Sequence, residues 1–249
     1  MSSILQSALL GIVQGITEFL PISSTTHLLL FEKALGFESS PGKTFEVVIQ
    51  FGSGLAIVLF FCKRLFSNIK LPLLLLLATI PVAIVGGIFR HEIKGFLYTP
   101  AIVSCSLIIG GLFFLFVEKF SKSRSSLDEI SAKQAGNVGI FQTLALIPGV
   151  SRSGSTIASG LLFGIERKAA VEFSFLLAIP ALCGAGIIEF IASYSSLTAE
   201  GGLVLFTGFT TAFLSSLLLI RPLINCIERR GLTPFGWYRI VLGFILLIM

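Results

Sequence analysis

Six long apolar stretches restrict this chain to an α-helical membrane protein. A bilayer core about 30 Å thick needs roughly 20 apolar residues per helix, and open strands would leave backbone groups unpaired in lipid. The chain is 54% hydrophobic and only 12% charged, whereas soluble domains carry about 25% charged residues. We therefore expect an all-α polytopic membrane protein. The predicted spans are 44–62, 71–89, 97–117, 168–192, 203–222 and 235–249.

The remaining composition excludes several other classes of protein. The net charge of +5 is explained by basic loops facing a cytoplasm, so we expect no nucleic-acid partner. The four cysteines lie in or beside apolar runs without paired spacing, which indicates neither a disulfide framework nor a zinc site. The N-terminal run lacks a basic start, so we expect no cleavable signal peptide.

Two polar strings, 14–27 and 142–156, interrupt the apolar sequence and resemble each other. Each contains a proline followed by a cluster of hydroxyl residues that can open a helix. Some twenty residues later an acid, Glu46 or Glu172, enters an apolar run, and matching positions lie 126 to 128 residues apart. Polar groups are costly at membrane depth. The duplication therefore indicates chemistry on an anion more readily than packing.

Four shorter helical segments surround these strings and cannot span a bilayer. Each pair is broken by a proline, which is typical of a re-entrant helical hairpin whose irregular backbone is buried in protein or lines a wet cavity. The four segments are about 3–18, 24–35, 136–147 and 152–164.

Each half of the chain then holds one re-entrant hairpin and three transmembrane helices. Because three is odd, the second half is predicted to be inverted relative to the first. We expect a single membrane domain, 1–249, made of two inverted repeats. Repeat one covers about 1–117, a cytoplasmic linker about 118–135, and repeat two about 136–249.

The distribution of basic residues predicts the orientation. With loop 63–70 inside, the inner loops hold twelve Lys and Arg residues and the outer side holds four, Lys33, Lys43, Arg90 and Lys94. This bias places both termini outside the cell membrane and brings the hairpins in from opposite faces. The first hairpin, and with it the active site, is expected to open to the outer side.

The first string carries residues suited to binding a cation and a phosphate. Gln14 and Glu18 are four apart and share a helix face, so their oxygens can hold a hard divalent cation together with water and phosphate oxygens. Pro21 ends this helix. Free N–H groups and the hydroxyls of a new helix start favour phosphate, and the residues there are Ser23, Ser24 and Thr25.

Ser24 and His27 are three apart on the second helix. A histidine at this spacing can act as base toward a serine nucleophile or protonate a leaving oxygen. A Ser-x-x-His pattern is common by chance, but the surrounding polar string favours a functional interpretation. Direct attack by His27, giving a phosphohistidine, is the alternative.

The second string adds an arginine among small residues. Gly149 and Gly154 allow close backbone approach, and Arg152 offers a planar fork for phosphate oxygens. A glycine-serine string is often only a flexible loop, but a membrane-embedded arginine argues against that interpretation. The hydroxyl donors are Ser151, Ser153, Ser155 and Thr156. By contrast, we expect Lys43, Glu166, Glu189 and Arg239, near predicted helix ends, to reach the interface.

These strings resemble the undecaprenyl-diphosphate phosphatase family, also called bacitracin-resistance proteins. The family motif [E/Q]-x-x-x-E matches residues 14–18, F-L-P-[VI]-S-S-T-x-H matches 19–27, and P-G-x-S-R-S-x-x-T matches 148–156. The resemblance covers nearly the whole chain. Two departures are Thr26 where glycine is usual and Gln14 as the less acidic option, which removes one negative charge from the metal site.

The resemblance implies hydrolysis of undecaprenyl diphosphate to undecaprenyl phosphate and phosphate, with Mg²⁺ or Ca²⁺ as cofactor. The reaction would recycle the lipid carrier for cell-wall synthesis in the bacterial cytoplasmic (inner) membrane. Bacitracin would be linked indirectly, because it sequesters the same substrate. Membrane lipids are expected neighbours, and a homodimer is compatible with the sequence. The competing interpretation is a transporter or flippase for a lipid phosphate or anion, because inverted repeats with broken helices are also a transporter architecture.

Together the residues and the resemblance give one predicted site. The catalytic candidates are Glu18, Ser24, His27 and Arg152; the metal ligands are Gln14 and Glu18; the substrate-binding candidates are Ser23, Thr25, Glu46, Ser151, Ser153 and Thr156.

Overall fold

The computed structural model describes residues 2–37, 44–89, 99–120, 125–184, 187 and 199–248, and this part of the chain is helical without strands. A single isolated bridge joins Ser125 and Ile165. The longer elements are α1 (Ser3–Thr17), α2 (Ser24–Leu35), α3 (Thr44–Ser67), α4 (Lys70–Ile88), α6 (Pro100–Phe120), α7 (Ala132–Gln142), α8 (Arg152–Leu162), α9 (Arg167–Ala178), α11 (Ala199–Arg230) and α12 (Thr233–Ile248). The short elements are the 3₁₀ turns η1 (Leu127–Glu129) and η2 (Thr143–Leu146) and the π-turn η3 (Ile179–Cys183).

Four helices of the described chain are long and apolar enough to cross a membrane: α3, α4, α6 and α11. Four predicted spans are thereby confirmed, and the protein is a multi-pass membrane protein. With 16 residues, α12 is shorter but strongly apolar. The surface agrees with a lipid environment, because large apolar side chains on α4 and α12 are exposed, among them Leu73, Ile80, Val241 and Phe244.

Two helix boundaries differ from the prediction. Within the expected span 168–192, α9 ends at Ala178, the π-turn η3 follows, and Gly184 and Ile187 are helical again. Residues 185–186 and 188–192 of this span lie outside the described residues. Pro180 lies in that turn and has no N–H to donate to the preceding turn, which explains the interruption. In contrast, the expected loop 221–233 is mostly helix, because α11 continues through Pro222 to Arg230. The segment between α6, which ends at Phe120, and α7, which begins at Ala132, holds the 3₁₀ turn η1.

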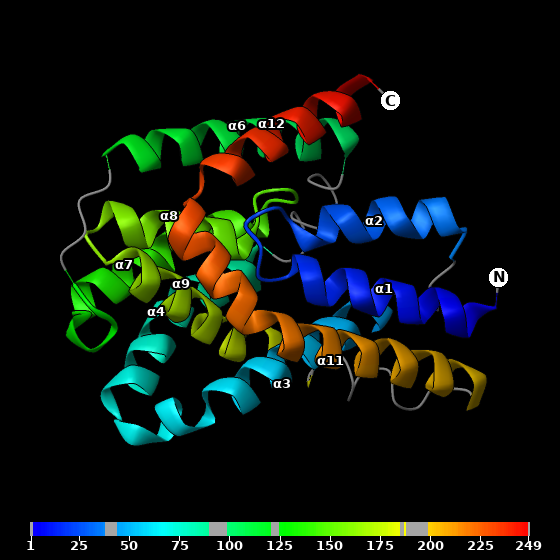
Figure 1. The fold of residues 1–249 in the computed structure, drawn as a ribbon, viewed down its shortest axis with the longest axis horizontal. Helices are drawn as coiled ribbons and strands as arrows, with labels where there is room; N and C mark the ends of the chain where they lie inside the picture. The colour runs from blue at the N-terminus through cyan, green and yellow to red at the C-terminus, as the bar shows by residue number, and fades with distance from the viewer. Residues whose placement is uncertain are drawn as a thin grey trace.

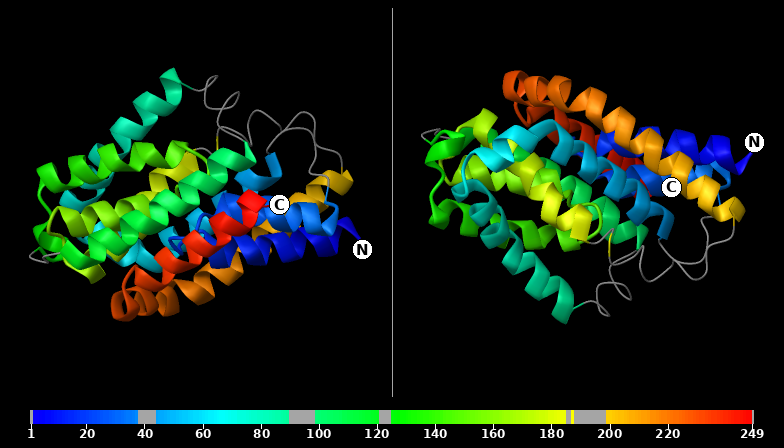
Figure 2. Two further views of the ribbon diagram at one scale, coloured as in Figure 1. Left: turned by 90° about the horizontal axis from the view of Figure 1, so that it is seen from above. Right: turned by 90° about the horizontal axis from the view of Figure 1, so that it is seen from below.

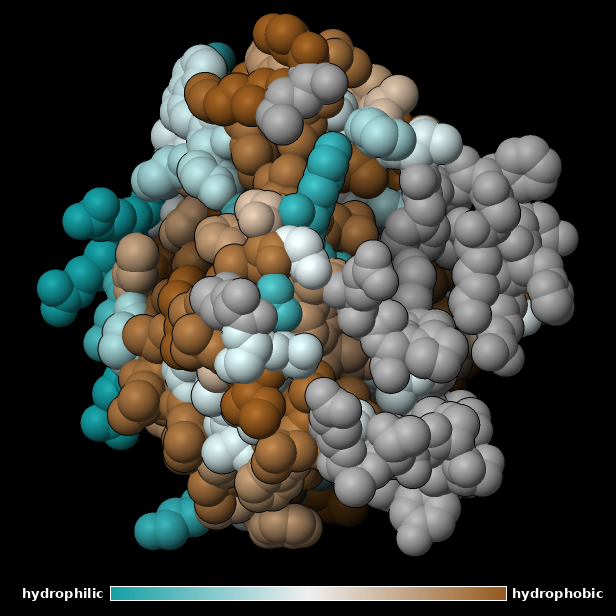
Figure 3. Space-filling view, turned by 90° about the vertical axis from the view of Figure 1, so that its right-hand side faces the viewer, coloured by the Kyte–Doolittle hydropathy of each residue, from teal (hydrophilic) through white to brown (hydrophobic). Residues whose placement is uncertain are grey.

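The short helices form the two expected pairs, α1 with α2 and α7 with α8. In Figure 1 the connection between α1 and α2 lies next to the connection between α7 and α8, near the middle of the molecule. The start of α1 and the end of α12 lie toward the same end of the molecule (Figures 1 and 2). Figure 3 looks onto that end, where most of the coloured surface is hydrophobic.

Helices that are distant in sequence cross closely at glycines. Gly11 and Gly15 of α1 face Thr211 and Ser215 of α11 so tightly that an added Cβ would overlap either side chain. On the opposite side α6 packs along α12, and α7 packs on α4. Small residues allow this close approach. Inside a membrane the hydrophobic effect does not drive helices together, because lipid tails are as apolar as the side chains, so close van der Waals packing stabilises the helix contacts. The crossings fix the positions of α1 and α7, the helices that precede the two central connections.

Candidate active site

Two serines shape the connections at the centre of the molecule. Ser23 and Ser151 both have φ 72°, and they are the only residues other than glycine with positive φ in the described chain. Such a conformation costs on the order of 1–3 kcal/mol and is retained where the surrounding structure fixes it. The next residue begins a helix in each case, α2 at Ser24 and α8 at Arg152. The strained turns therefore aim two helix starts at one place.

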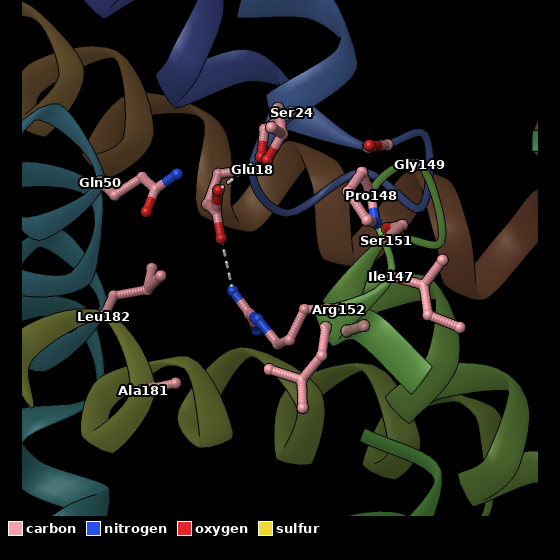
Figure 4. A pocket seen from close by; sticks show the side chains of 14 residues that line it. Glu18, Ser24, Gln50, Ile147, Pro148, Gly149, Ser151, Arg152, Ala181 and Leu182 are labelled. Carbon is pink, nitrogen blue, oxygen red and sulfur yellow. Dashed lines mark hydrogen bonds and ion pairs between the residues drawn. The ribbon is translucent and has the colours of Figure 1, made fainter. Parts of the chain in front are cut away.

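A pocket lies at this place and is lined from both connections (Figure 4). Its polar lining comes from Glu18, Ser23, Ser24, Thr25, Gln50, Ser151 and Arg152. The rest of the wall is Ala145, Leu146, Ile147, Pro148, Gly149, Ala181 and Leu182, so the π-turn η3 contributes two residues. Two helix starts at one pocket favour an anionic ligand, because the positive ends of both helix dipoles lie there.

The Glu18 carboxylate connects the two strings. Its Oε2 accepts hydrogen bonds from Ser24 Oγ at 2.8 Å and from Gln14 Nε2 at 2.9 Å. Its Oε1 accepts from Arg152 Nη2 at 2.8 Å, an ion pair whose carboxylate is almost completely buried. Figure 4 shows Glu18 and Arg152 pointing toward each other across the pocket. The structure thus brings together four predicted residues from strings that are far apart in sequence.

Arg152 is held from a second side. Its Nη1 donates to the backbone oxygen of Ser174 at 2.9 Å, while its Nε is buried without a partner in the described chain. Guanidinium groups bind phosphate through parallel N–H donors. An anion entering the pocket would therefore meet a guanidinium already fixed in position.

His27 is not placed as the sequence suggested. It does not line the pocket. Its Nδ1 lies 2.8 Å from the Ser23 backbone oxygen and its Nε2 lies 2.6 Å from the Tyr238 hydroxyl. Ser24 Oγ donates to Glu18 instead of His27. The base nearest to the Ser24 hydroxyl is therefore the Glu18 carboxylate.

Three further candidates, Ser153, Thr156 and Glu46, do not line the pocket. Ser153 Oγ donates to the Leu20 backbone oxygen at 3.0 Å, which ties the two connections together. Thr156 is buried and its Oγ1 contacts the Arg152 backbone oxygen at 2.9 Å. Glu46 does not line the pocket, whereas Gln50, one turn later on α3, does. Thr25 and Ser151 face the pocket as expected.

The oxygens of Gln14 and Glu18 fit a hard cation in part. Gln14 Oε1 is buried without a hydrogen-bond partner among the described residues, but the amide presents its Nε2 to the Glu18 carboxylate. Both side chains could hold one cation only after this amide rotates. The described chain has no cluster of three His, Cys, Asp or Glu side chains. A cation here would thus take its remaining oxygens from water and phosphate, as Mg²⁺ commonly does.

Sequence reasoning missed three residues around the site: Gln50, Tyr238 and Arg239. Gln50 could have been found from its position one turn after Glu46. Tyr238 and Arg239 lie in α12, more than 200 residues from the first string. The expectation that Arg239 reaches the interface is wrong, because the residue is 0% exposed.

The chain matches the family model described as "Bacitracin resistance protein BacA" over residues 7–245. It belongs to this family. The resemblance of the two strings to bacitracin-resistance proteins is thereby confirmed, and the match covers both connections that line the pocket.

Relatives with high similarity carry one activity in their names. The undecaprenyl-diphosphatase of Persephonella marina is 46% identical over 250 residues, covering 98% of both chains. The undecaprenyl-diphosphatase 2 of Paramagnetospirillum magneticum is 40% identical over 256 residues, also covering 98% of both. The undecaprenyl-diphosphatase of Bordetella avium is 42% identical over 262 residues, covering 95% of this chain and 93% of its own.

Proposed function

We propose that this protein hydrolyses undecaprenyl diphosphate to undecaprenyl phosphate and inorganic phosphate. The observation that carries the proposal is the Glu18 carboxylate, which joins the Ser24 hydroxyl and the Arg152 guanidinium at the wall of one pocket. A carboxylate, a hydroxyl and a guanidinium are the base, nucleophile and phosphate clamp that phosphoryl transfer requires. Transport of an anion alone would not need a hydroxyl bound to a carboxylate.

In this reaction the Ser24 oxygen attacks the terminal phosphorus and its proton passes to Glu18 Oε2. The anhydride bond breaks and undecaprenyl phosphate leaves. Water then hydrolyses the phosphoserine, which releases phosphate and restores the hydroxyl. Arg152 and the N-termini of α2 and α8 stabilise the developing negative charge. Because the diphosphate competes with Glu18 for Arg152, substrate binding would also free the carboxylate to act as base.

His27 is better suited to orienting this nucleophile than to activating it. A backbone carbonyl can only accept, so Nδ1 carries a proton toward Ser23, and in the neutral imidazole Nε2 then accepts from the Tyr238 hydroxyl. This arrangement fixes the turn that presents Ser24. We therefore assign His27 the role of holding the Ser23–Ser24 turn, with Glu18 as the base. Attack by His27 itself would require its bond to Tyr238 to break.

We propose Mg²⁺ or Ca²⁺ as the cofactor, held by Gln14 and Glu18. The cation would neutralise part of the diphosphate charge. Gln14 would supply a neutral oxygen once its amide rotates away from the hydrogen bond that Nε2 donates to Glu18. With Glu18 as the only carboxylate, the protein contributes a single negative charge.

We propose a single membrane domain built from two inverted repeats, about 1–117 and 136–249. Two packing relations support an internal symmetry: α1 packs on α11, and α7 packs on α4. Ser23 and Ser151, which share the same φ, are 128 residues apart. Two repeats related by an axis in the membrane plane would bring their broken helices together in this way.

The proposed location is the bacterial cytoplasmic membrane, with both termini and the pocket facing outward. Single cysteines in a cysteine-free background test the orientation, using the exposed positions Ser2 and Asn68. A cysteine at Ser2 should react with an impermeant thiol reagent in intact cells, and one at Asn68 should not. The reverse pattern would overturn the orientation. Lys43 and Arg124, the more obvious loop positions, lie outside the described residues.

Phosphate release from a C15 or C55 polyprenyl diphosphate by the purified protein in detergent tests the activity. Wild type should release phosphate, and Ser24→Ala should reduce the rate by at least about a hundredfold. Ser67→Ala, an exposed serine at the end of α3, is the matched control and should match wild type. Because detergent offers no second compartment, absence of release by wild type would favour the transporter. In cells, overproduction should raise the bacitracin concentration needed to stop growth.

A further inference from the structure

Arg239 is a completely buried arginine in the middle of α12. Its exposure is 0%, and no ion pair in the described chain involves it. Removing a charge from water is costly unless other groups replace the lost hydration. The groups that contact its guanidinium therefore indicate what the residue is for.

Backbone oxygens from both central connections surround this guanidinium. Nη1 lies 3.4 Å from the Pro21 oxygen, and Nη2 lies 3.0 Å from the Gly149 oxygen. Each of these carbonyls is two residues before a serine with φ 72°, Ser23 or Ser151. One side chain thus contacts equivalent points of the two strained turns.

The guanidinium also has a fitted slot. Its carbon lies 5.0 Å from the centre of the buried Phe114 ring, and Nη2 donates to the Ser106 oxygen of α6 at 3.1 Å. Gly110 leaves no spare room, because a Cβ there would overlap Nη2. Phe114 in turn packs against Gly154, in the first turn of α8. These contacts fix the planar group from several directions.

We propose that Arg239 is a positioning residue that sets the spacing of the two connections. It would thereby hold the Glu18–Ser24 pair of one connection against Arg152 of the other. A guanidinium reaches separated carbonyls from different nitrogens held in one plane, whereas the three N–H donors of a lysine ammonium all start from one nitrogen, so its acceptors must lie around a single point. The kinetic part of this inference rests on the proposed hydrolysis, whereas the spacing part does not.

The spacing is measured first, independently of activity. In a cysteine-free background, cysteines at Thr25 and Ile147 line the pocket from the two connections. A short bifunctional thiol reagent should crosslink them at least about fivefold more slowly in Arg239→Lys than in the parent, because the carbonyls would lose their shared donor. Equal crosslinking rates in the two proteins would overturn the inference, whether or not the protein proves to be a phosphatase.

A second variant covers the case in which Arg239→Lys fails to fold, judged by its melting temperature in detergent. Gly110→Ala keeps the arginine but displaces its Nη2. Like Arg239→Lys, it should slow crosslinking relative to the parent. Arg167→Lys is the matched control. Arg167 forms a two-pronged ion pair with Glu118 away from the pocket, so this variant should lower the melting temperature without changing the crosslinking rate.

The kinetic test separates positioning from general support of the fold. Arg239→Lys should lower kcat at least about tenfold while KM changes less than about threefold, because alignment matters most in the transition state. In an Arg152→Lys background the same change should cost less than about threefold, since the fork being aligned is already lost. If the fold decrease in kcat of the double variant equalled the product of the two single-variant decreases, Arg239 would not act through Arg152, and the inference would be wrong.

Discussion

The connection between α1 and α2 has a similar backbone conformation to the connection between α7 and α8, but the two carry different functional side chains. Both place a serine at φ 72° directly before a helix. The first helical residue is Ser24 in one and Arg152 in the other. Upstream, Glu18 in the first connection corresponds to Leu146 in the second, counted back from these serines, and both line the pocket. The site is therefore assembled from two copies of one turn that carry complementary side chains.

The two turns also differ in how they are held. Ser151 stabilises its own helix, because its Oγ accepts a hydrogen bond from the Gly154 N–H at 3.2 Å. Ser23 has no such cap, and its backbone oxygen depends on His27, which in turn depends on Tyr238. Arg239 of α12 contacts both connections, but the turn that carries the nucleophile is supported by a second residue of that helix, Tyr238. We therefore expect activity to be more sensitive to loss of the contacts that hold the Ser23 turn than to loss of those that hold the Ser151 turn.

The largest effect is expected from Glu18→Gln in the connection between α1 and α2. The substitution removes the negative charge of this side chain and keeps its size. Activity should fall by about a thousandfold, on the order of 4 kcal/mol in transition-state stabilisation. Phosphate release should stay low at any Mg²⁺ or Ca²⁺ concentration, and EDTA should abolish wild-type activity. Glu129→Gln, an exposed glutamate that caps η1, is the control and should have no effect. An active Glu18→Gln in EDTA would remove both proposed roles of this carboxylate.

Arg152→Lys tests the connection between α7 and α8. It should lower kcat/KM at least about tenfold, on the order of 1.4 kcal/mol. The charge remains, but lysine cannot contact Glu18 and the Ser174 oxygen together as the planar group does. Steady-state phosphate release measures the loss, with Arg167→Lys as the control for losing a paired arginine elsewhere. A lysine variant close to wild type would reduce Arg152 to a general electrostatic role.

Tyr238→Phe tests whether the first turn depends on α12. Removing one hydroxyl should lower kcat about three- to tenfold, near 1 kcal/mol, because His27 loses the partner of its Nε2. Trp237→Phe is the adjacent control, since this side chain is exposed on the apolar surface. If Tyr238→Phe had wild-type kcat while Ser151→Ala did not, the ranking of the two turns would be reversed.

The smallest effect is expected from Gln14→Glu. A second carboxylate next to Glu18 should raise the apparent affinity for Mg²⁺ or Ca²⁺ several-fold, because charge count tunes the affinity of oxygen sites. Titration of activity against the free cation measures this shift. An unchanged or weaker affinity would argue against Gln14 as a ligand.

Local sequence patterns predicted the parts of the site that depend on near neighbours. The prolines and hydroxyl clusters located both helix pairs, because a proline lies between the two helices of each pair and a serine directly precedes the second helix. The four-residue spacing of Gln14 and Glu18 predicted side chains in contact, and they are hydrogen bonded. The apolar runs located α3, α4, α6 and α11.

Features that depend on tertiary packing were beyond such patterns. A Ser-x-x-His spacing permits a hydrogen bond, but Tyr238, from α12, occupies the histidine. Hydropathy could not distinguish an arginine at a helix end from one enclosed by carbonyls, so Arg239 was misplaced. The end of α9 follows from Pro180, which lies in the π-turn η3. A proline does not always interrupt a membrane helix, because α11 continues as an α-helix through Pro222. The sequence alone does not distinguish these two outcomes.

The ion pair between Glu18 and Arg152 has a consequence for biosynthesis. The two residues are 134 positions apart, so at roughly 5–20 residues per second the ribosome needs on the order of ten seconds to supply the arginine after the glutamate. The packing partner of α1, α11, emerges later still. During this interval the first hairpin has neither its counter-charge nor its neighbour. The segment therefore lacks both partners until later parts of the chain are made, and the site forms only when the last helices arrive.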